Sequence, residues 1–160
     1  MDKMKLKLVA LFSAALLCLH QGVANTKPLD DFKLRHLVVM TLWKEARGET
    51  PLGVQAVAEV IWNRAKHDKS KLQEVVLKPK QFSCWNKDKF DLRAALKVEE
   101  LYGKTSAYRT CEALALKMVG GTFSSESAWN HYYNPKLCFP RWATPDKVKA
   151  GKVRFLLTIS

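Results

Sequence analysis

The sequence is poor in glycine, proline and acidic residues. Its 7 glycines and 6 prolines are scattered over 160 residues, which excludes collagen-like repeats and low-complexity linkers. Hydrophobic residues make up 48% of the chain, which excludes an intrinsically disordered protein. This length supports one hydrophobic core but not two catalytic domains, so we expect a single globular domain.

The shortage of acidic residues gives the chain a strongly positive charge. Its 15 Asp and Glu face 27 Lys and Arg, and the formal net charge is +12. A charge of this size indicates an anionic partner. On this ground alone the partner is nucleic acid, anionic lipid or an anionic cell-wall polymer.

Signatures of metal binding are also absent from the sequence. It contains no CxxC or HExxH motif, and its 4 histidines are widely separated. Zinc sites need Cys and His ligands at close and regular spacings. We therefore predict neither a metal site nor a cofactor.

No hydrophobic run is long enough to cross a bilayer comfortably, but the N-terminus has the layout of a secretory signal peptide. Met1–Lys7 is basic, Leu8–Leu19 is apolar, and small residues precede a cleavage site after Ala24. We expect residues 1–24 to be removed, with an uncleaved anchor as the alternative. The mature protein, residues 25–160, is then a monomer in the periplasm, in the cell wall or outside the cell, with neither stable membrane insertion nor a nucleic-acid partner.

Three cysteines remain in the expected mature protein: Cys84, Cys111 and Cys138. An oxidising compartment favours disulfide formation, so we expect at most one disulfide, with one thiol left over. Three pairings are possible, and spacing does not choose among them.

Apolar spacing predicts a mainly helical α+β domain with about five helices and a small C-terminal part of strands and loops. Thr50 has the character of an N-cap with proline at the first helical position, and Ser70–Gln73 has the form of a capping box. The helical period ends after Val119, and the tail predicts a strand. The expected helices cover residues 31–47, 51–65, a short stretch from the capping box to before Pro79, 92–102 and 107–119, and the expected strand lies within 152–159.

Glu45 stands out because it lies on the apolar stripe of the first helix, in line with Leu34, Leu37 and Leu42. A carboxyl group on a core-facing line either finds a partner or keeps its proton, as a general acid does. The alternative is an ion pair with Arg47 or Arg64 near the helix end. Spacing alone does not decide between the two.

Three sequence segments, in this order along the chain, form a combination specific to one family: residues 43–65 (WKEARGETPLGVQAVAEVIWNRA), 75–86 (VVLKPKQFSCWN) and 130–143 (NHYYNPKLCFPRWA). Together they resemble the SleB-type cell wall hydrolase family, the spore cortex-lytic enzymes and their relatives. The resemblance covers about Val38–Ala143. It implies a lysozyme-like catalytic domain that cleaves peptidoglycan glycan strands, typically as a lytic transglycosylase. The chain departs from the family in its tail, which lacks a His-x-Phe-Tyr ending, and it has no peptidoglycan-binding repeat.

The resemblance also implies roles for individual residues. Glu45, the first Glu of EARGE, matches the catalytic acid. Glu49 is a second carboxylate, for which bracing of the loop is the alternative to a role in the site. Gln55 is expected to make a buried hydrogen bond. The expected substrate-binding residues are Glu49, Gln55, Gln81, Phe82, Ser83, His131, Tyr132 and Trp142.

Four other functions stay open at this point. A muramidase-type hydrolase or a phage endolysin would share the fold. A Cys/His wall peptidase would use Cys84 or Cys111 as nucleophile and His131 as base. A cationic wall-binding protein without activity would explain the charge but not the setting of Glu45.

Overall fold

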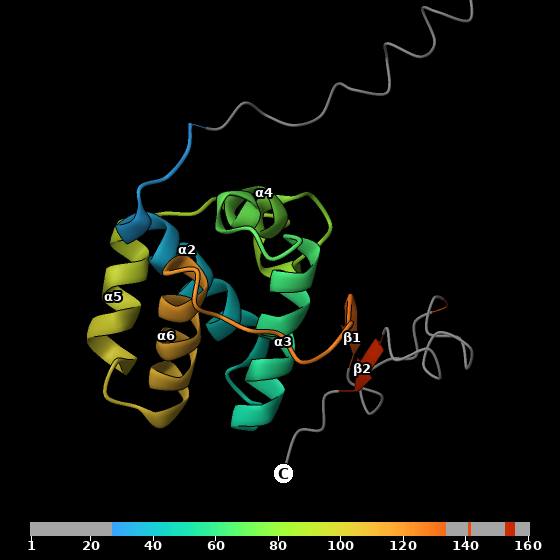
Figure 1. The fold of residues 1–160 in the computed structure, drawn as a ribbon. Coiled ribbons are helices and arrows are strands. Elements are labelled where there is room, and N and C mark those ends of the chain that lie inside the picture. Colours follow the sequence, from blue (N-terminus) through green and yellow to red (C-terminus); the bar gives the residue numbers. More distant parts are fainter. Residues whose placement is uncertain (1–26, 134–140, 142–152, 156–160) are drawn as a thin grey trace, which may run out of the picture.

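The protein is described here by a computed structural model that covers residues 27–133, 141 and 153–155. In these ranges the chain forms five α-helices, two short strands and two 3-10 turns (Figure 1). The elements are α2 (Asp31–Ala46), α3 (Pro51–Arg64), η2 (Lys69–Lys71), α4 (Leu72–Leu77), η3 (Ser83–Trp85), α5 (Leu92–Tyr102), α6 (Ser106–Val119), β1 (His131–Tyr133) and β2 (Val153–Phe155). The prediction of a mainly helical domain is confirmed.

Helix α2 is the centre of the domain. Ten of its 16 residues are buried, so it presents apolar side chains to neighbours on most of its circumference. It packs against α3, α4, α5 and α6, and its C-terminal part also contacts η3. The catalytic candidate at the end of α2 therefore lies on the helix that contacts each of the other four described helices.

The helix starts follow capping chemistry. Side chains of N-cap residues accept hydrogen bonds from backbone N–H groups of the first turns, which satisfies donors that have no partner inside the helix. The caps of α2, α3, α5 and α6 are Asp30, Thr50, Asp91 and Thr105.

The capping box predicted at Ser70–Gln73 is wrong. Asp68 caps the 3-10 turn instead, by accepting from the backbone N–H and hydroxyl of Ser70. Gln73 turns away from the helix start: its Oε1 accepts from Leu29 N at 2.8 Å, and its Nε2 donates to Lys27 O. A long-range contact with the N-terminal segment has replaced the local one.

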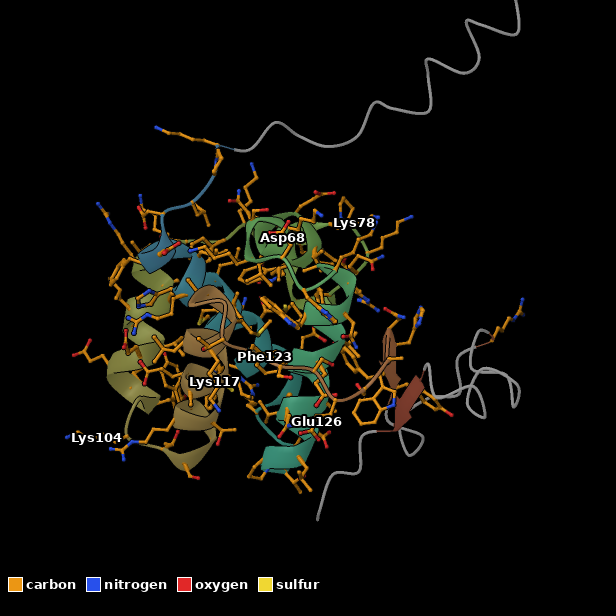
Figure 2. The ribbon with its side chains drawn as sticks, in the orientation of Figure 1. Asp68, Lys78, Lys104, Lys117, Phe123 and Glu126 are labelled. Carbon is orange, nitrogen blue, oxygen red and sulfur yellow. The ribbon has the colours of Figure 1, made fainter. Side chains whose placement is uncertain are left out.

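After α6 the chain crosses to α3. Gly121 has φ +71°, and the turn lets Thr122 and Phe123 donate back to the carbonyl of Lys117. Phe123, labelled in Figure 2, then enters the space between α6 and α3. Its ring lies 5.9 Å from that of Trp62.

The segment that follows is fixed to the end of α3. Asn63 Nδ2 donates to the carbonyls of Ser127 and Trp129, both at 2.9 Å. This segment leads into β1, which pairs in parallel with β2 in the register His131↔Val153 and Tyr133↔Phe155. The predicted strand in the tail is therefore present but shorter, and it lies beside β1 at the edge of the domain next to α3 (Figure 1).

Candidate active site

The Glu45 carboxylate is the meeting point of three chain segments. Glu45 lies in the last turn of α2, where its side chain is half-buried. Its Oε1 accepts from Ser83 Oγ and from the backbone N–H of Cys84, each at 3.0 Å. Its Oε2 accepts from the Tyr132 hydroxyl at 2.9 Å. The structure thus brings Ser83 and Tyr132, both predicted as site residues, onto the predicted catalytic carboxylate.

The ion-pair alternative for Glu45 is not what the structure shows. Among the described residues no ion pair includes Glu45. Arg47 is exposed, and Arg64 Nε donates instead to the carbonyl of Asn130 at 2.9 Å. The Glu45 carboxylate is therefore held by hydroxyl and backbone N–H groups.

A buried hydroxyl on α2 fixes the η3 side of the site. Thr41 Oγ1 donates to Leu37 O at 2.8 Å and accepts from the indole N–H of Trp85 at 3.0 Å. Thr41 lies one helical turn before Glu45, and Trp85 directly follows Cys84. Three hydrogen bonds to one helix, one at Thr41 and two at Glu45, therefore hold η3 in place.

The Tyr132 phenol is in an environment that keeps it protonated. Burial raises the pKa of Tyr132 well above 10, and the neighbouring Glu45 carboxylate raises it further through its charge and its hydrogen bond. The Arg64 guanidinium opposes this rise without cancelling it. Tyr132 therefore remains a hydrogen-bond donor to Glu45 throughout the neutral pH range.

Asn63 and Arg64 support the site, and sequence reasoning gave them no such role. Asn63 holds the segment before β1, and Arg64 holds Asn130 and lies over the ring of Phe82 at 5.5 Å. The sequence does show a polar Asn-Arg pair at the end of the apolar stripe of α3, and such a pair indicates contacts with another segment. What was missing is the partner segment, which lies more than 60 residues further on.

Two open pockets adjoin the Glu45 cluster. One contains Ser83 and Cys84, and basic side chains give it a positive character; its remaining lining residues are Lys44, Arg47, Asn86, Lys87 and Asp88. The other lies on the Tyr132 side and contains the exposed side chains of Gln81 and His131; it is completed by Arg64, Glu74, Val75, Lys78 and Asn130. The first pocket is thus lined by two residues that bind Glu45, and the second by His131, which directly precedes Tyr132 in the chain.

Other predicted site residues lie elsewhere. Phe82 is 1% exposed and packs in the core beneath Arg64. Gln55 donates to Glu59 Oε1 at 3.1 Å, and both line a separate pocket with Ser127 and Trp129. Glu59 is itself buried and also accepts from the Ser127 hydroxyl.

The two remaining predicted residues are Glu49, which lies beside the start of α3, and Trp142. Glu49 packs against the first turn of α3, where a Cβ added to Gly53 would meet Glu49 Cβ at 2.8 Å. This packing suits the bracing of the loop that the sequence left as an alternative. Trp142 lies outside the described residues, as do Cys138 and the expected signal peptide.

The thiols have the wrong character for a nucleophile. Burial raises the pKa of the Cys84 thiol far above its usual range, and the Glu45 carboxylate adds to the rise. Burial also raises the pKa of Cys111 to about 12. Both cysteines are free, and neither forms a reactive thiolate at neutral pH. The Cys/His peptidase interpretation loses its support.

In the part of the chain that the structure describes, no cluster of three His, Cys, Asp or Glu side chains is arranged to hold a metal ion. Among the same residues, no helix has the length and apolar character needed to cross a membrane.

Comparison with known proteins shows the family of the chain. A model of the cell wall hydrolase family matches residues 48–156, which is more than half of the chain. The match includes η3 and β1 but begins just after Glu45, whose assignment therefore depends on the geometry and on the EARGE motif. No curated protein and no solved structure matches the chain. The chain belongs to the cell wall hydrolase family, the family of SleB-type enzymes that degrade peptidoglycan.

Proposed function

We propose that the protein is a lytic transglycosylase that cleaves the bond between MurNAc and GlcNAc with Glu45 as its one catalytic carboxylate. The observation that carries this proposal is the set of groups on Glu45. Two hydroxyls and one backbone N–H contact its oxygens among the described residues, and no second carboxylate does. A glycosidase of the ordinary retaining or inverting type needs a second carboxylate as nucleophile or base.

In the first step Glu45 donates its proton to the oxygen between MurNAc C1 and GlcNAc. The C1–O bond breaks, and GlcNAc leaves with a free hydroxyl. Positive charge develops at C1, and the Glu45 carboxylate that remains is negatively charged and close to it.

In the second step the C6 hydroxyl of the same MurNAc attacks C1. Glu45 takes the hydroxyl proton and returns to its starting state, so one carboxyl group serves as acid and then as base. No water enters the reaction, and the product ends in 1,6-anhydro-muramic acid.

The neighbours of Glu45 suit this change of protonation. The hydroxyls of Ser83 and Tyr132 both donate and accept hydrogen bonds. They can donate to the ionised carboxylate, and either can accept from the protonated acid after rotation. The Cys84 N–H keeps its bond to Oε1 in both states.

The alternative with a second carboxylate has weaker support. Glu59 already accepts from Gln55 and Ser127, and Glu49 packs on the first turn of α3. Among the described residues, neither has a hydrogen bond to Glu45, Ser83, Cys84 or Tyr132. A hydrolase of the muramidase type would hold its second carboxylate about 5–9.5 Å from Glu45 without contact, so the reaction products, and not hydrogen bonds, separate the two reactions.

The two pockets beside Glu45 are the proposed sugar sites. Gln81 and His131 are the groups we assign to substrate contact on the Tyr132 side, because both are exposed there. The basic side chains of the pocket beside Ser83 suit the carboxylates of muropeptides. We propose that the mature enzyme is exported, and that its positive charge helps to hold it on anionic wall polymer.

Product analysis tests the mechanism. Purified peptidoglycan is digested with the mature protein, and the soluble muropeptides are separated and weighed by mass spectrometry. We expect 1,6-anhydro ends, each lighter by one water than the reducing end left by a muramidase. Reducing ends alone would make the enzyme a hydrolase, and released peptides with intact glycan would refute glycan cleavage.

A further inference from the structure

We infer that Arg64 is a positioning residue of the reaction, because it ties together the two segments whose groups bind Glu45. This inference rests on the proposed role of Glu45. Arg64 ends α3, and no hydrogen bond or ion pair joins it directly to Glu45 among the described residues. It acts through what it holds on each side.

On the first side Arg64 holds the strand that carries Tyr132. Its Nε donates to the carbonyl of Asn130 at 2.9 Å, two residues before Tyr132. The guanidinium charge also acts directly on the phenol, where it opposes the rise in the pKa of Tyr132. Arg64 thereby fixes both the backbone that delivers Tyr132 and the electrostatic setting of its hydroxyl.

On the second side Arg64 holds the turn that carries Ser83 and Cys84. Its guanidinium lies 5.5 Å from the centre of the Phe82 ring, and Phe82 is the N-cap of η3. Phe82 is fully buried, so the ring cannot move without repacking the core. One planar side chain therefore contacts both segments that converge on the carboxylate.

Stability alone does not explain this arginine. Its Nη1 is buried and has no hydrogen-bond partner in the described part of the chain, and burial lowers the pKa of its guanidinium. A buried donor without a partner destabilises a fold. The burial of Arg64 is explained if this side chain positions the two segments that bind Glu45.

The inference predicts a specific kinetic signature. A residue that orients Glu45 through Tyr132 and Ser83 lowers the rate of the chemical step. Because Arg64 also lines the pocket of Gln81 and His131, a change in KM reports a glycan contact, whereas a fall in kcat reports positioning. Arg64→Lys keeps a positive charge but loses the planar fork that bonds and stacks at the same time. We expect kcat to fall about tenfold or more, with a much smaller change in KM.

Arg35→Lys is the matched control. Arg35 also lies over a phenylalanine ring, that of Phe32 at 5.6 Å, and also bonds an oxygen, Glu112 Oε1 at 3.3 Å. It lies near the other end of α2, three turns from Glu45. The same chemical change there is expected to leave kcat and KM at their wild-type values.

The experiment measures kcat and KM on soluble, uncross-linked glycan strands for wild type, both lysine variants, Tyr132→Phe and the double variant Arg64→Lys/Tyr132→Phe. Because Arg64 acts partly through Tyr132, its substitution is expected to cost much less in the Tyr132→Phe background than in wild type. Phe82→Leu, which removes the ring under Arg64 but keeps an apolar side chain, is expected to lower kcat in the same direction. If Arg64→Lys does not fold, the kinetics of Phe82→Leu test the inference in its place.

Several results would overturn the inference. A rise in KM at constant kcat would make Arg64 a substrate contact. A lower Tm with unchanged kinetics would make it purely structural, and fully additive effects of Arg64→Lys and Tyr132→Phe would remove the proposed route. The proposed function fails separately, by the wrong product ends or by an active Glu45→Gln.

Discussion

The groups around the Glu45 carboxylate can also form hydrogen bonds with a glutamine side chain at this position. In Glu45→Gln the remaining oxygen accepts from Ser83 and Cys84, and the new amide N–H donates to the oxygen of Tyr132. We expect a folded protein with nearly unchanged Tm that cannot protonate the leaving oxygen. General acid catalysis supplies about 10² to 10⁴ in rate, so clearing of a peptidoglycan suspension falls by at least that factor.

Thermal melting is the control for this variant. Normal clearing combined with a Tm well below wild type would make Glu45 a structural residue and would refute its catalytic assignment.

Cys84 gives a second test among single residues. It binds Glu45 through its backbone N–H, which every residue except proline provides, and its thiol has a strongly raised pKa. We expect Cys84→Ala to keep most of the glycan-cleaving activity. Loss of activity in Cys84→Ala, together with release of free peptides by wild type, would restore the Cys/His peptidase hypothesis.

Single residues also show what the sequence can and cannot predict. Glu45, Ser83 and Tyr132 were predicted because each lies in a motif with a recognisable pattern, and the structure brings them together. Arg64 was visible only as one possible ion-pair partner. Its proposed role depends on a carbonyl at Asn130, and a backbone acceptor leaves no mark in the sequence.

Between elements, the bond from Trp85 to Thr41 joins η3 to α2. Thr41→Val keeps the shape of a fully buried side chain but leaves the indole N–H without its acceptor. We expect the free energy of unfolding to fall by about 1–2 kcal/mol, and kcat to fall several-fold as Ser83 loses its fixed position. Denaturant unfolding and clearing assays measure the two effects.

Thr110→Val is the matched control for Thr41→Val. Thr110 makes the same hydroxyl bond to the carbonyl one turn earlier, at 3.0 Å to Ser106, but accepts no indole N–H. Its substitution is expected to change neither quantity measurably. Equal effects in both variants would assign the loss to the helix and not to Trp85.

Element starts and ends were predictable where local chemistry decides them. Thr50, Pro51 and the apolar stripe placed α3 correctly, because capping and helix period act over a few residues. The start of α4 was wrong because Gln73 binds the distant N-terminal segment. Such competition between local and long-range partners requires knowledge of the packing.

For the whole molecule, two thiols and two phenols with raised pKa values predict a loss of stability at alkaline pH. Burial raises the pKa of Tyr108 to about 12 and of Cys111 to about 12, and the pKa values of Cys84 and Tyr132 are raised as well. The unfolded chain loses these protons first, near pH 9 for the thiols and pH 10 for the phenols. Stability is therefore complete below about pH 9 and falls as pH rises.

Urea unfolding at several pH values above 8 measures this decline. Tyr108→Phe removes one of the four groups without opening a cavity, so its stability is expected to fall less steeply between pH 10 and pH 12. An unchanged slope in Tyr108→Phe would show that Tyr108 does not contribute.

Export is testable on the whole chain. If residues 1–24 are a signal peptide, the protein recovered outside the cytoplasm begins at Asn25. Its intact mass gives the N-terminus, and thiol titration counts the free cysteines. A mass that includes Met1 would contradict the expected processing. The structure leaves both Cys84 and Cys111 as free thiols, which contradicts the expected disulfide, so thiol titration is expected to find both of them free.

The three bonds on Glu45 join residues separated by 38, 39 and 87 positions. Helices form from local contacts within microseconds, whereas contacts across such separations wait for loop closure. During refolding, helical content is therefore expected to return before enzymatic activity, because the Glu45 carboxylate lacks its hydrogen bond from Tyr132 until β1 has docked beside α3. The enzyme becomes active only when the last third of its chain is in place.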